Sequence, residues 1–180
     1  HYGYGVKGFT LSMIETAIEV TEDRVPARVI RELIEAGQEM LRYPIELLPH
    51  ARAAVEAVAQ DHRVLLITKG DLLDQERKLA QSGLGDLFDG VEIVSEKTTG
   101  VYVDIFTRHG DGPEQAMMIG NSMRSDVVPV VAAGGWGVYV PHGQVWEIEH
   151  AEEPVAAARY RKVPDLEVLP QLVTRINTSR

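Results

Sequence analysis

The sequence contains no cysteine among its 180 residues. Disulfide bonds, a thiol nucleophile and thiolate metal ligands are therefore excluded for this chain. A chain without disulfides suits a reducing compartment, so we expect a cytoplasmic protein. The sequence also lacks an apolar run of the roughly 18 residues that a membrane span needs. The longest candidate, residues 127–140, is interrupted by Pro129 and by three glycines. We therefore expect no membrane partner.

The chain has no basic stripe either. Its 18 lysines and arginines stand against 27 acidic residues, which gives a formal net charge of −9 that is spread along the sequence. Nucleic-acid binding depends on clustered basic residues, so we expect no nucleic-acid partner. Hydrophobic residues make up 44% of the chain and charged residues 25%. These proportions are typical of a water-soluble chain that fills one ordinary core and a small appendage.

The start of the chain predicts helices without a strand. Apolar residues recur at helical spacing over residues 9–20 and again over residues 29–41, and Pro44 follows the second helix. We expect residues 1–45 to form a small helical appendage and residues 46–180 to form a separate α/β body.

From residue 50 onward, short apolar runs alternate with helical segments. Strands are predicted at residues 63–67, 91–94, 116–119, 136–140 and 160–163, and helices at residues 51–60, 71–81, 101–109, 124–133 and 166–176. This alternation favours an α/β fold with a Rossmann-like parallel sheet and helices on both faces. In such sheets, functional residues gather at the carboxyl ends of the strands.

Two predicted strand ends carry groups that suit an anion. The segment LLITKG places Thr68, Lys69 and Gly70 just past a buried strand. A threonine hydroxyl and nearby backbone N–H groups make a good grip for an oxyanion. The plainer interpretation is a strand-to-helix turn with a solvated lysine. Lys97, after the next strand, is expected to be exposed, where it would offset phosphate charge or serve as an ordinary surface lysine.

A third strand end, MMIGNSMRSD, is rich in oxygen ligands. Asn121, Ser122, Ser125 and Asp126 follow the apolar strand directly. Oxygen-bearing side chains at the mouth of a parallel sheet suit a hard cation such as Mg²⁺. A helix start capped by Asn121 or Ser122 is the alternative interpretation, and it explains only one or two of these residues.

The order of these segments resembles the motifs of the haloacid-dehalogenase-like superfamily. LLITKG is similar to its second motif, Lys97 to its third and GNSMRSD to its fourth, and the likeness runs from about residue 49 to residue 141. The resemblance implies that Thr68 binds the transferring phosphoryl oxygen and that Lys97 holds the nucleophile and the phosphate. It also implies that residues 1–45 are part of the family's cap, which normally selects the substrate.

The resemblance implies a metal site and a phosphate site as well. Asp126, with Asn121, would hold or orient Mg²⁺. The family usually has aspartate where Asn121 stands, and Asn121 coordinates only through a neutral carbonyl oxygen. The further substrate-binding residues would be Lys69, Gly70 and Ser122.

The family's first motif, a strand that ends in Asp-x-Asp, does not occur in this sequence. Its first aspartate attacks phosphorus and its second serves as general acid and base. We expect that a stretch upstream of His1 carries this strand and that the chain alone is inactive. The strands at residues 63–67 and 116–119 should then flank the absent strand and not pair with each other.

The resulting functional expectation is a Mg²⁺-dependent phosphatase for a small phosphorylated metabolite, with a homodimer as one assembly to test. A haloacid dehalogenase on the same fold is an alternative, although its chemistry needs no metal. A non-catalytic binding or regulatory module is another. A phosphoacceptor receiver domain does not fit the helical start. A dinucleotide site at AAGGWG fits less well, because those glycines precede a strand and the dinucleotide fingerprint follows one.

Overall fold

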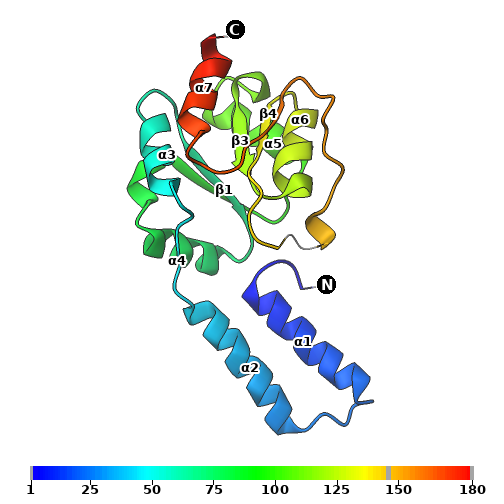
Figure 1. Cartoon of the computed structure of the whole chain (residues 1–180). Coiled ribbons are helices and arrows are strands. Elements are labelled where there is room, and N and C mark those ends of the chain that lie inside the picture. The colour runs from blue at the N-terminus through cyan, green and yellow to red at the C-terminus, as the bar shows by residue number, and fades with distance from the viewer. Residues whose placement is uncertain (1, 145–146, 179–180) are drawn as a thin grey trace. The chain divides into compact units, whose positions relative to one another are not determined.

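The computed structural model describes residues 2–144 and 147–178 (Figure 1). The helices are α1 Val6–Val20, α2 Ala27–Arg42, α3 Ala51–Val58, α4 Leu72–Ser82, α5 Thr99–His109, α6 Val128–Ala132 and α7 Leu169–Thr178. The strands are β1 Leu65–Lys69, β2 Gly90–Val94, β3 Met117–Gly120, β4 Trp136–Tyr139 and β5 Tyr160–Lys162. Short turns are η1 Gly85–Leu87, η2 Pro113–Gln115, η3 Met123–Val127 and η4 Glu147–Glu149. None of the described helices has the length and apolarity to cross a membrane.

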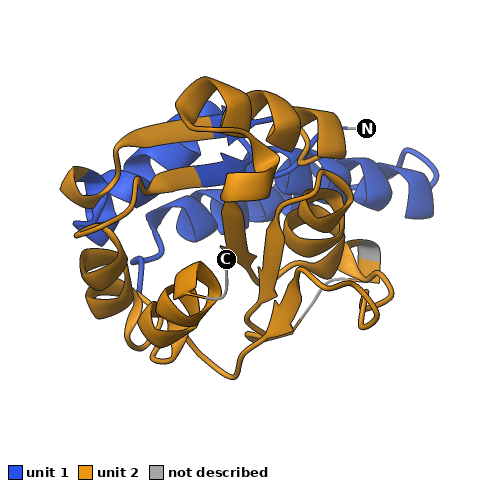
Figure 2. Ribbon diagram, turned by 90° about the horizontal axis from the view of Figure 1, so that it is seen from above, with its two compact units in different colours: residues 1–46, 67–85, 93–95 blue, residues 47–66, 86–92, 96–180 orange. Residues whose placement is uncertain are grey.

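The chain divides into two compact units, which Figure 2 shows in different colours. Unit 1 contains the segments up to residue 46, 67–85 and 93–95, and unit 2 contains 47–66, 86–92 and the chain from residue 96 onward. Unit 1 therefore combines the helical start with two later segments. The assignment of residues 1–45 as a cap and residues 46–180 as the body stays a prediction.

In unit 1, α1 and α2 pack side by side (Figure 1). Gly37 of α2 allows the close approach, because a Cβ atom there would lie 2.3 Å from Thr10 Oγ1 of α1. Helix α1 begins three residues before its predicted start, directly after Gly5, whose φ of 107° is a conformation that favours glycine.

The main sheet of unit 2 consists of β3, β4 and β5 in that order, and both pairings are parallel. On one face, Val138 of β4 packs with Leu172 and Ile176 of α7 in the hydrophobic core. On the other face, a Cβ atom at Gly137 would meet the side chain of Val131 of α6 at 2.8 Å, so a side chain there would obstruct the packing of α6. The predicted parallel sheet with helices on both faces is confirmed here.

Strands β1 and β2 form a separate two-stranded sheet. Strand β1 begins at Leu65, two residues after its predicted start, because Val64 exchanges hydrogen bonds with Asp89 instead. Asp89 Oδ2 accepts the Val64 N–H at 2.8 Å, and the Asp89 N–H donates to the Val64 carbonyl at 2.8 Å. At its other end β1 includes Thr68 and Lys69. The expectation that these two residues lie just past the strand is wrong.

Strands β1 and β3 are not hydrogen-bonded neighbours within the described ranges, since β1 pairs with β2 and β3 pairs with β4. This is the pairing expected if a further strand lies between them.

Candidate active site

The turn after β3 is wider than the α-helical start expected at residue 124. It is a π-helical turn over Met123–Val127, in which the Val127 N–H donates to the Ser122 carbonyl at 3.3 Å. Ser122 caps the turn, because its Oγ accepts the Ser125 N–H at 2.9 Å. Single π turns within helices occur frequently at functional sites. Asp126 is part of this turn, and its N–H donates to the Ser122 carbonyl at 2.9 Å.

Asp126 is buried, with 4% of its surface exposed. Its Oδ1 lies 2.8 Å from Lys97 Nζ, and its Oδ2 accepts the Ser122 N–H at 2.9 Å. The motif glycine has a clear role here, because a Cβ atom at Gly120 would lie 2.2 Å from Asp126 Oδ2. The turn therefore needs glycine at position 120 to admit the carboxylate.

Lys97 stands on the loop between β2 and α5, 29 positions before its partner Asp126. Only 11% of its side chain is exposed, so the expectation of an exposed lysine is wrong. The physical reason is the buried carboxylate, which draws the ammonium group inward. Removing one member of a buried ion pair leaves an uncompensated charge and costs about 3–5 kcal/mol.

Two further residues support this turn, and the sequence analysis did not identify them. The hydroxyl of Tyr102, on α5, donates to the Ser125 carbonyl at 3.0 Å. Burial first, and the nearby negative charge of Asp126 second, raise the pKa of Tyr102, which keeps the phenol a neutral donor. Glu149 accepts hydrogen bonds from the hydroxyls of Ser122 and Ser125. Helical periodicity predicts the burial of Tyr102, but no sequence signal points to Glu149.

The turn after β3 supplies only some of the oxygen ligands that a bound cation needs. Asp126 supplies a carboxylate, and Asn121, which directly follows β3, is exposed and supplies an amide oxygen. Among the described residues, no group of three or more His, Cys, Asp or Glu is arranged to hold a metal ion. Hard oxygen donors suit Mg²⁺, which takes about six ligands, several of them waters. The two residues fit part of such a site.

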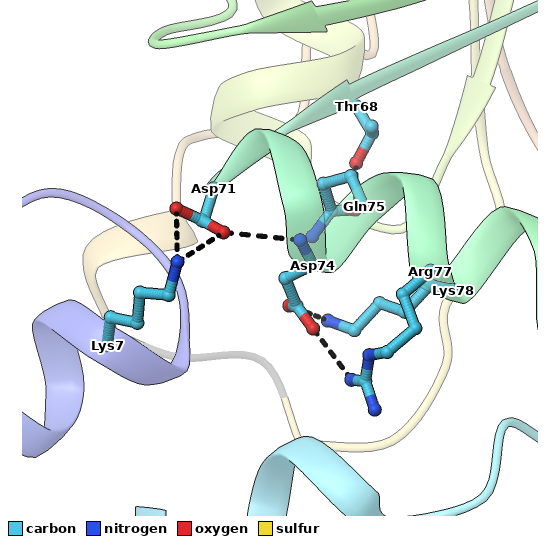
Figure 3. Close-up of polar contacts among 7 residues, drawn as sticks. All are labelled: Lys7, Thr68, Asp71, Asp74, Gln75, Arg77 and Lys78. Atoms are coloured by element: carbon cyan, nitrogen blue, oxygen red, sulfur yellow. Dashed lines mark hydrogen bonds and ion pairs between the residues drawn. The ribbon is translucent and has the colours of Figure 1, made fainter.

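The phosphate-binding candidates of unit 1 are Thr68, Lys69 and Gly70, at the end of β1, and Figure 3 shows Thr68 among them. Thr68 Oγ1 donates to Gln75 Oε1 of α4 at 2.9 Å. Lys69 Nζ lies 3.8 Å from the centroid of the Tyr4 ring, so this lysine takes part in a cation–π contact and is not simply solvated. Gly70 has a φ of 139°, which a residue with a side chain rarely adopts.

A second polar network follows on α4 (Figure 3). Lys7 Nζ of α1 lies 3.0 Å from Asp71 Oδ1, and Asp71 also caps α4 through the Asp74 N–H. The hydrogen bond from Lys7 is the main cause that lowers the pKa of Asp71. Asp74 is buried. Its Oδ1 lies 2.7 Å from Arg77 Nη2, and its Oδ2 lies 2.9 Å from Lys78 Nζ. Burial acts to raise the pKa of Asp74, but these two cations outweigh it and lower the pKa.

The structure thus brings together Lys97, Ser122 and Asp126 in unit 2, with Asn121 next in the chain to Ser122. Thr68, together with Lys69 and Gly70, belongs to unit 1. Their convergence with the Lys97–Asp126 pair stays a prediction.

Comparison with solved structures assigns the family. A haloacid dehalogenase-like family hydrolase from Xanthomonas campestris is 47% identical, with a TM-score of 0.87, over 99% of this chain and 71% of that chain. A predicted phosphoglycolate phosphatase from Haemophilus somnus is 15% identical, with a TM-score of 0.69, over 95% of this chain and 78% of that chain. The putative HAD-hydrolase YfnB from Bacillus subtilis, bound to magnesium, is 15% identical, with a TM-score of 0.59, over 93% of this chain and 82% of that chain.

The last two structures, at 15% identity, show the fold alone. No family profile and no curated protein matches the chain. The identity with the Xanthomonas hydrolase extends over nearly the whole chain, and that protein belongs to the family that the three motifs resemble. This chain belongs to the haloacid dehalogenase-like family of hydrolases.

Proposed function

We propose that the protein is a Mg²⁺-dependent phosphatase that hydrolyses a small phosphomonoester through an aspartyl-phosphate intermediate. The nucleophilic aspartate would lie on a segment outside this sequence. The observation that carries the proposal is the buried Lys97–Asp126 pair on the turn after β3. A homodimeric state and a cytoplasmic location stay predictions.

The chemistry of Lys97 suits phosphoryl transfer. An ammonium group has three N–H donors, and Asp126 engages one of them at 2.8 Å. The other donors remain to bind a phosphoryl oxygen or the attacking carboxylate. Charge interactions act strongly in a site with little exposure to water, and phosphoryl transfer depends mainly on positioning and on such charge stabilisation. In this proposal Asp126 fixes the position of the ammonium group.

Thr68, Ser122 and the two cation donors complete the proposed site. The Thr68 hydroxyl, with Lys69 and the backbone at Gly70, would bind the transferring phosphoryl group, and Ser122 would contribute to substrate binding. Asp126 and Asn121 would supply oxygen ligands to Mg²⁺. When bound, the cation offsets charge on the phosphoryl group.

The nucleophile motif is the part of the proposal that needs a further segment. Strands β1 and β3 each have one pairing partner among the described strands. Unpaired backbone groups at the edge of a buried strand are costly, so a strand on these edges would stabilise both sheets. A strand ending in Asp-x-Asp would at the same time supply the nucleophile and the general acid and base.

Two other functions compete with this proposal. A haloacid dehalogenase would need no metal, and the oxygen-rich turn at Asn121 and Asp126 favours the phosphatase over it. A non-catalytic binding module would have little use for the Lys97–Asp126 pair. Buried ion pairs seldom stabilise a fold more than apolar residues of the same volume would, so their presence favours a functional role.

The test is a steady-state assay of the intact protein on a panel of phosphomonoesters, with Mg²⁺ or with EDTA. We expect Mg²⁺-dependent phosphate release that EDTA abolishes, and a loss of roughly 100-fold or more in Asp126→Ala. Asp104→Ala, which removes an exposed carboxylate that pairs with Arg108, is the matched control and should leave turnover unchanged.

Each competing function gives a different result in the same assay. Full phosphatase activity in EDTA would contradict the metal role. Halide release from 2-haloacids in EDTA, without phosphate release, would establish the dehalogenase. Substrate binding without release of phosphate or halide would favour the non-catalytic binding module.

A further inference from the structure

The connection between β4 and β5 carries Glu149 to the turn after β3. Glu149 ends the short helix η4, and its Oε2 accepts the Ser125 hydroxyl at 2.6 Å and also the Ser122 hydroxyl. These serines lie 24 and 27 positions earlier in the chain. One carboxylate oxygen therefore joins a long connection to both hydroxyls of the motif turn.

The Ser122 hydroxyl acts in two hydrogen bonds at once. A hydroxyl has one hydrogen to donate and two lone pairs to accept with. Ser122 donates to Glu149, and its oxygen accepts the Ser125 N–H at 2.9 Å. Glu149 therefore directs the hydrogen of Ser122 away from the turn, which leaves a lone pair facing the Ser125 N–H.

The effect of Glu149 reaches the ion pair through Ser122. The Ser122 N–H donates to Asp126 Oδ2 at 2.9 Å, and Asp126 Oδ1 holds Lys97. Ser122 thus donates its hydroxyl hydrogen to Glu149 and its backbone N–H to Asp126. The turn Met123–Val127 that follows Ser122 is π-helical, a rare form that occurs frequently at functional sites.

We propose that Glu149 is a positioning residue for the reaction of this protein. It holds the turn Met123–Val127 from outside, so that Asp126 and Lys97 keep their relative orientation. The catalytic consequence rests on the proposed phosphatase function, whereas the structural link from Glu149 to the turn does not. The role requires a hydrogen-bond acceptor at position 149 and does not require a negative charge.

The experiment compares Glu149→Ala, Glu149→Gln and Glu147→Ala in the intact protein. Glu147 is the matched control, because it is exposed on the same short helix. The amide oxygen of glutamine can still accept both hydroxyl hydrogens. We expect Glu149→Ala to lower kcat roughly 10- to 100-fold, since a misplacement of about 1 Å costs this much. Glu149→Gln should stay within about threefold of wild type, because an amide oxygen has two lone pairs and can accept both hydroxyl hydrogens. Glu147→Ala should equal wild type.

A second readout is independent of activity. Hydrogen exchange at the amides of residues 122–127 should accelerate in Glu149→Ala and not in Glu149→Gln or Glu147→Ala. Unchanged exchange in Glu149→Ala would overturn the inference, whether or not the wild type is a phosphatase. Equal kcat losses in the alanine and glutamine variants would also overturn it, because charge would then be the property that matters. If the wild type releases no phosphate but exchange responds as expected, the proposed function fails and the structural link stands.

Discussion

Two buried aspartates, each 4% exposed, hold cations in very different ways. Asp74 of unit 1 contacts Arg77 and Lys78, which lie three and four positions later on the same helix. Asp126 of unit 2 contacts Lys97, which comes from another loop 29 positions earlier, and a backbone N–H. One network is local to α4, and the other joins separate elements.

The difference indicates which network is suited to chemistry. The cations of Asp74 remain 30% and 39% exposed, so water screens them and they serve mainly to neutralise a helix carboxylate. The side chain of Lys97 is 11% exposed, and its partner Asp126 lies in a turn that Gly120, Tyr102 and Glu149 support. A charge held in place with little water around it can stabilise a transition state, whereas a screened one contributes chiefly to stability.

The largest expected effect is that of Lys97→Met. The substitution removes the charge that we propose to act on the phosphoryl group and leaves Asp126 buried without its cation. Turnover should fall roughly 100- to 1,000-fold, and the free energy of unfolding should fall by about 3–5 kcal/mol. Kinetics and thermal melts on the same preparation measure both. Lys78→Met is the matched control and should have a small effect on each, because Arg77 still holds Asp74. Equal losses of turnover and stability in Lys97→Met and Lys78→Met would contradict the different roles assigned to the two networks.

Asp74→Asn should have an intermediate effect that is confined to stability. We expect a loss of about 1–3 kcal/mol at neutral pH and turnover within about twofold of wild type, because the cations that pair with the Asp74 carboxylate, Arg77 and Lys78, are not part of the proposed site. Thermal melts measure the loss of stability, and kcat at pH 7 measures the effect on turnover. A large loss of turnover with the protein still folded would mean that α4 contributes to the reaction.

The pH dependence of the same variant sharpens this prediction. The folded pKa of Asp74 lies below the ordinary value of 3.8, so its stabilising contribution is present above that pH. It is lost as the pH falls through the lower, folded pKa. The difference in Tm between wild type and Asp74→Asn should therefore be constant from pH 7 to about pH 5 and shrink below about pH 4. A difference that grows on acidification would contradict this sign.

The smallest effect should come from Lys7→Ala. The Lys7–Asp71 pair is 55% and 30% exposed, and exposed pairs contribute little to stability. We expect a change in Tm near the limit of measurement, which should disappear in high salt because salt screens exposed charges. Thermal melts at low and high ionic strength decide this. A salt-insensitive loss would show that Lys7 acts through packing of its alkyl chain.

Local patterns in the sequence predicted most of the fold. Each predicted helix and strand is found, and the errors are shifts of a few residues at the ends. These errors arise where long-range contacts replace a local rule. Strand β1 starts late because the Val64 backbone pairs with Asp89, and the helix after β3 starts as a π turn because Ser122 caps it and Asp126 turns back to Ser122 and Lys97.

The candidate site was predictable only as far as its motifs extend. The order of Thr68, Lys97 and Asp126 identified the family, and Gly120 proved to be required by packing against Asp126. The burial of Lys97 was not predictable, because it depends on a carboxylate 29 positions away. Glu149 lies on a connection without hydrophobic periodicity, so its contact with the two serines becomes visible only in three dimensions.

The most direct test of the central claim compares Asp126→Asn with Asp74→Asn in the intact protein. Both substitutions remove the charge of a buried aspartate and keep its size. The measurement is kcat/KM for Mg²⁺-dependent phosphate release, at a temperature where both variants are fully folded. We predict a loss of roughly 100-fold or more for Asp126→Asn and less than about twofold for Asp74→Asn. Equal values for the two variants would contradict the assignment of the Lys97–Asp126 pair as the catalytic centre.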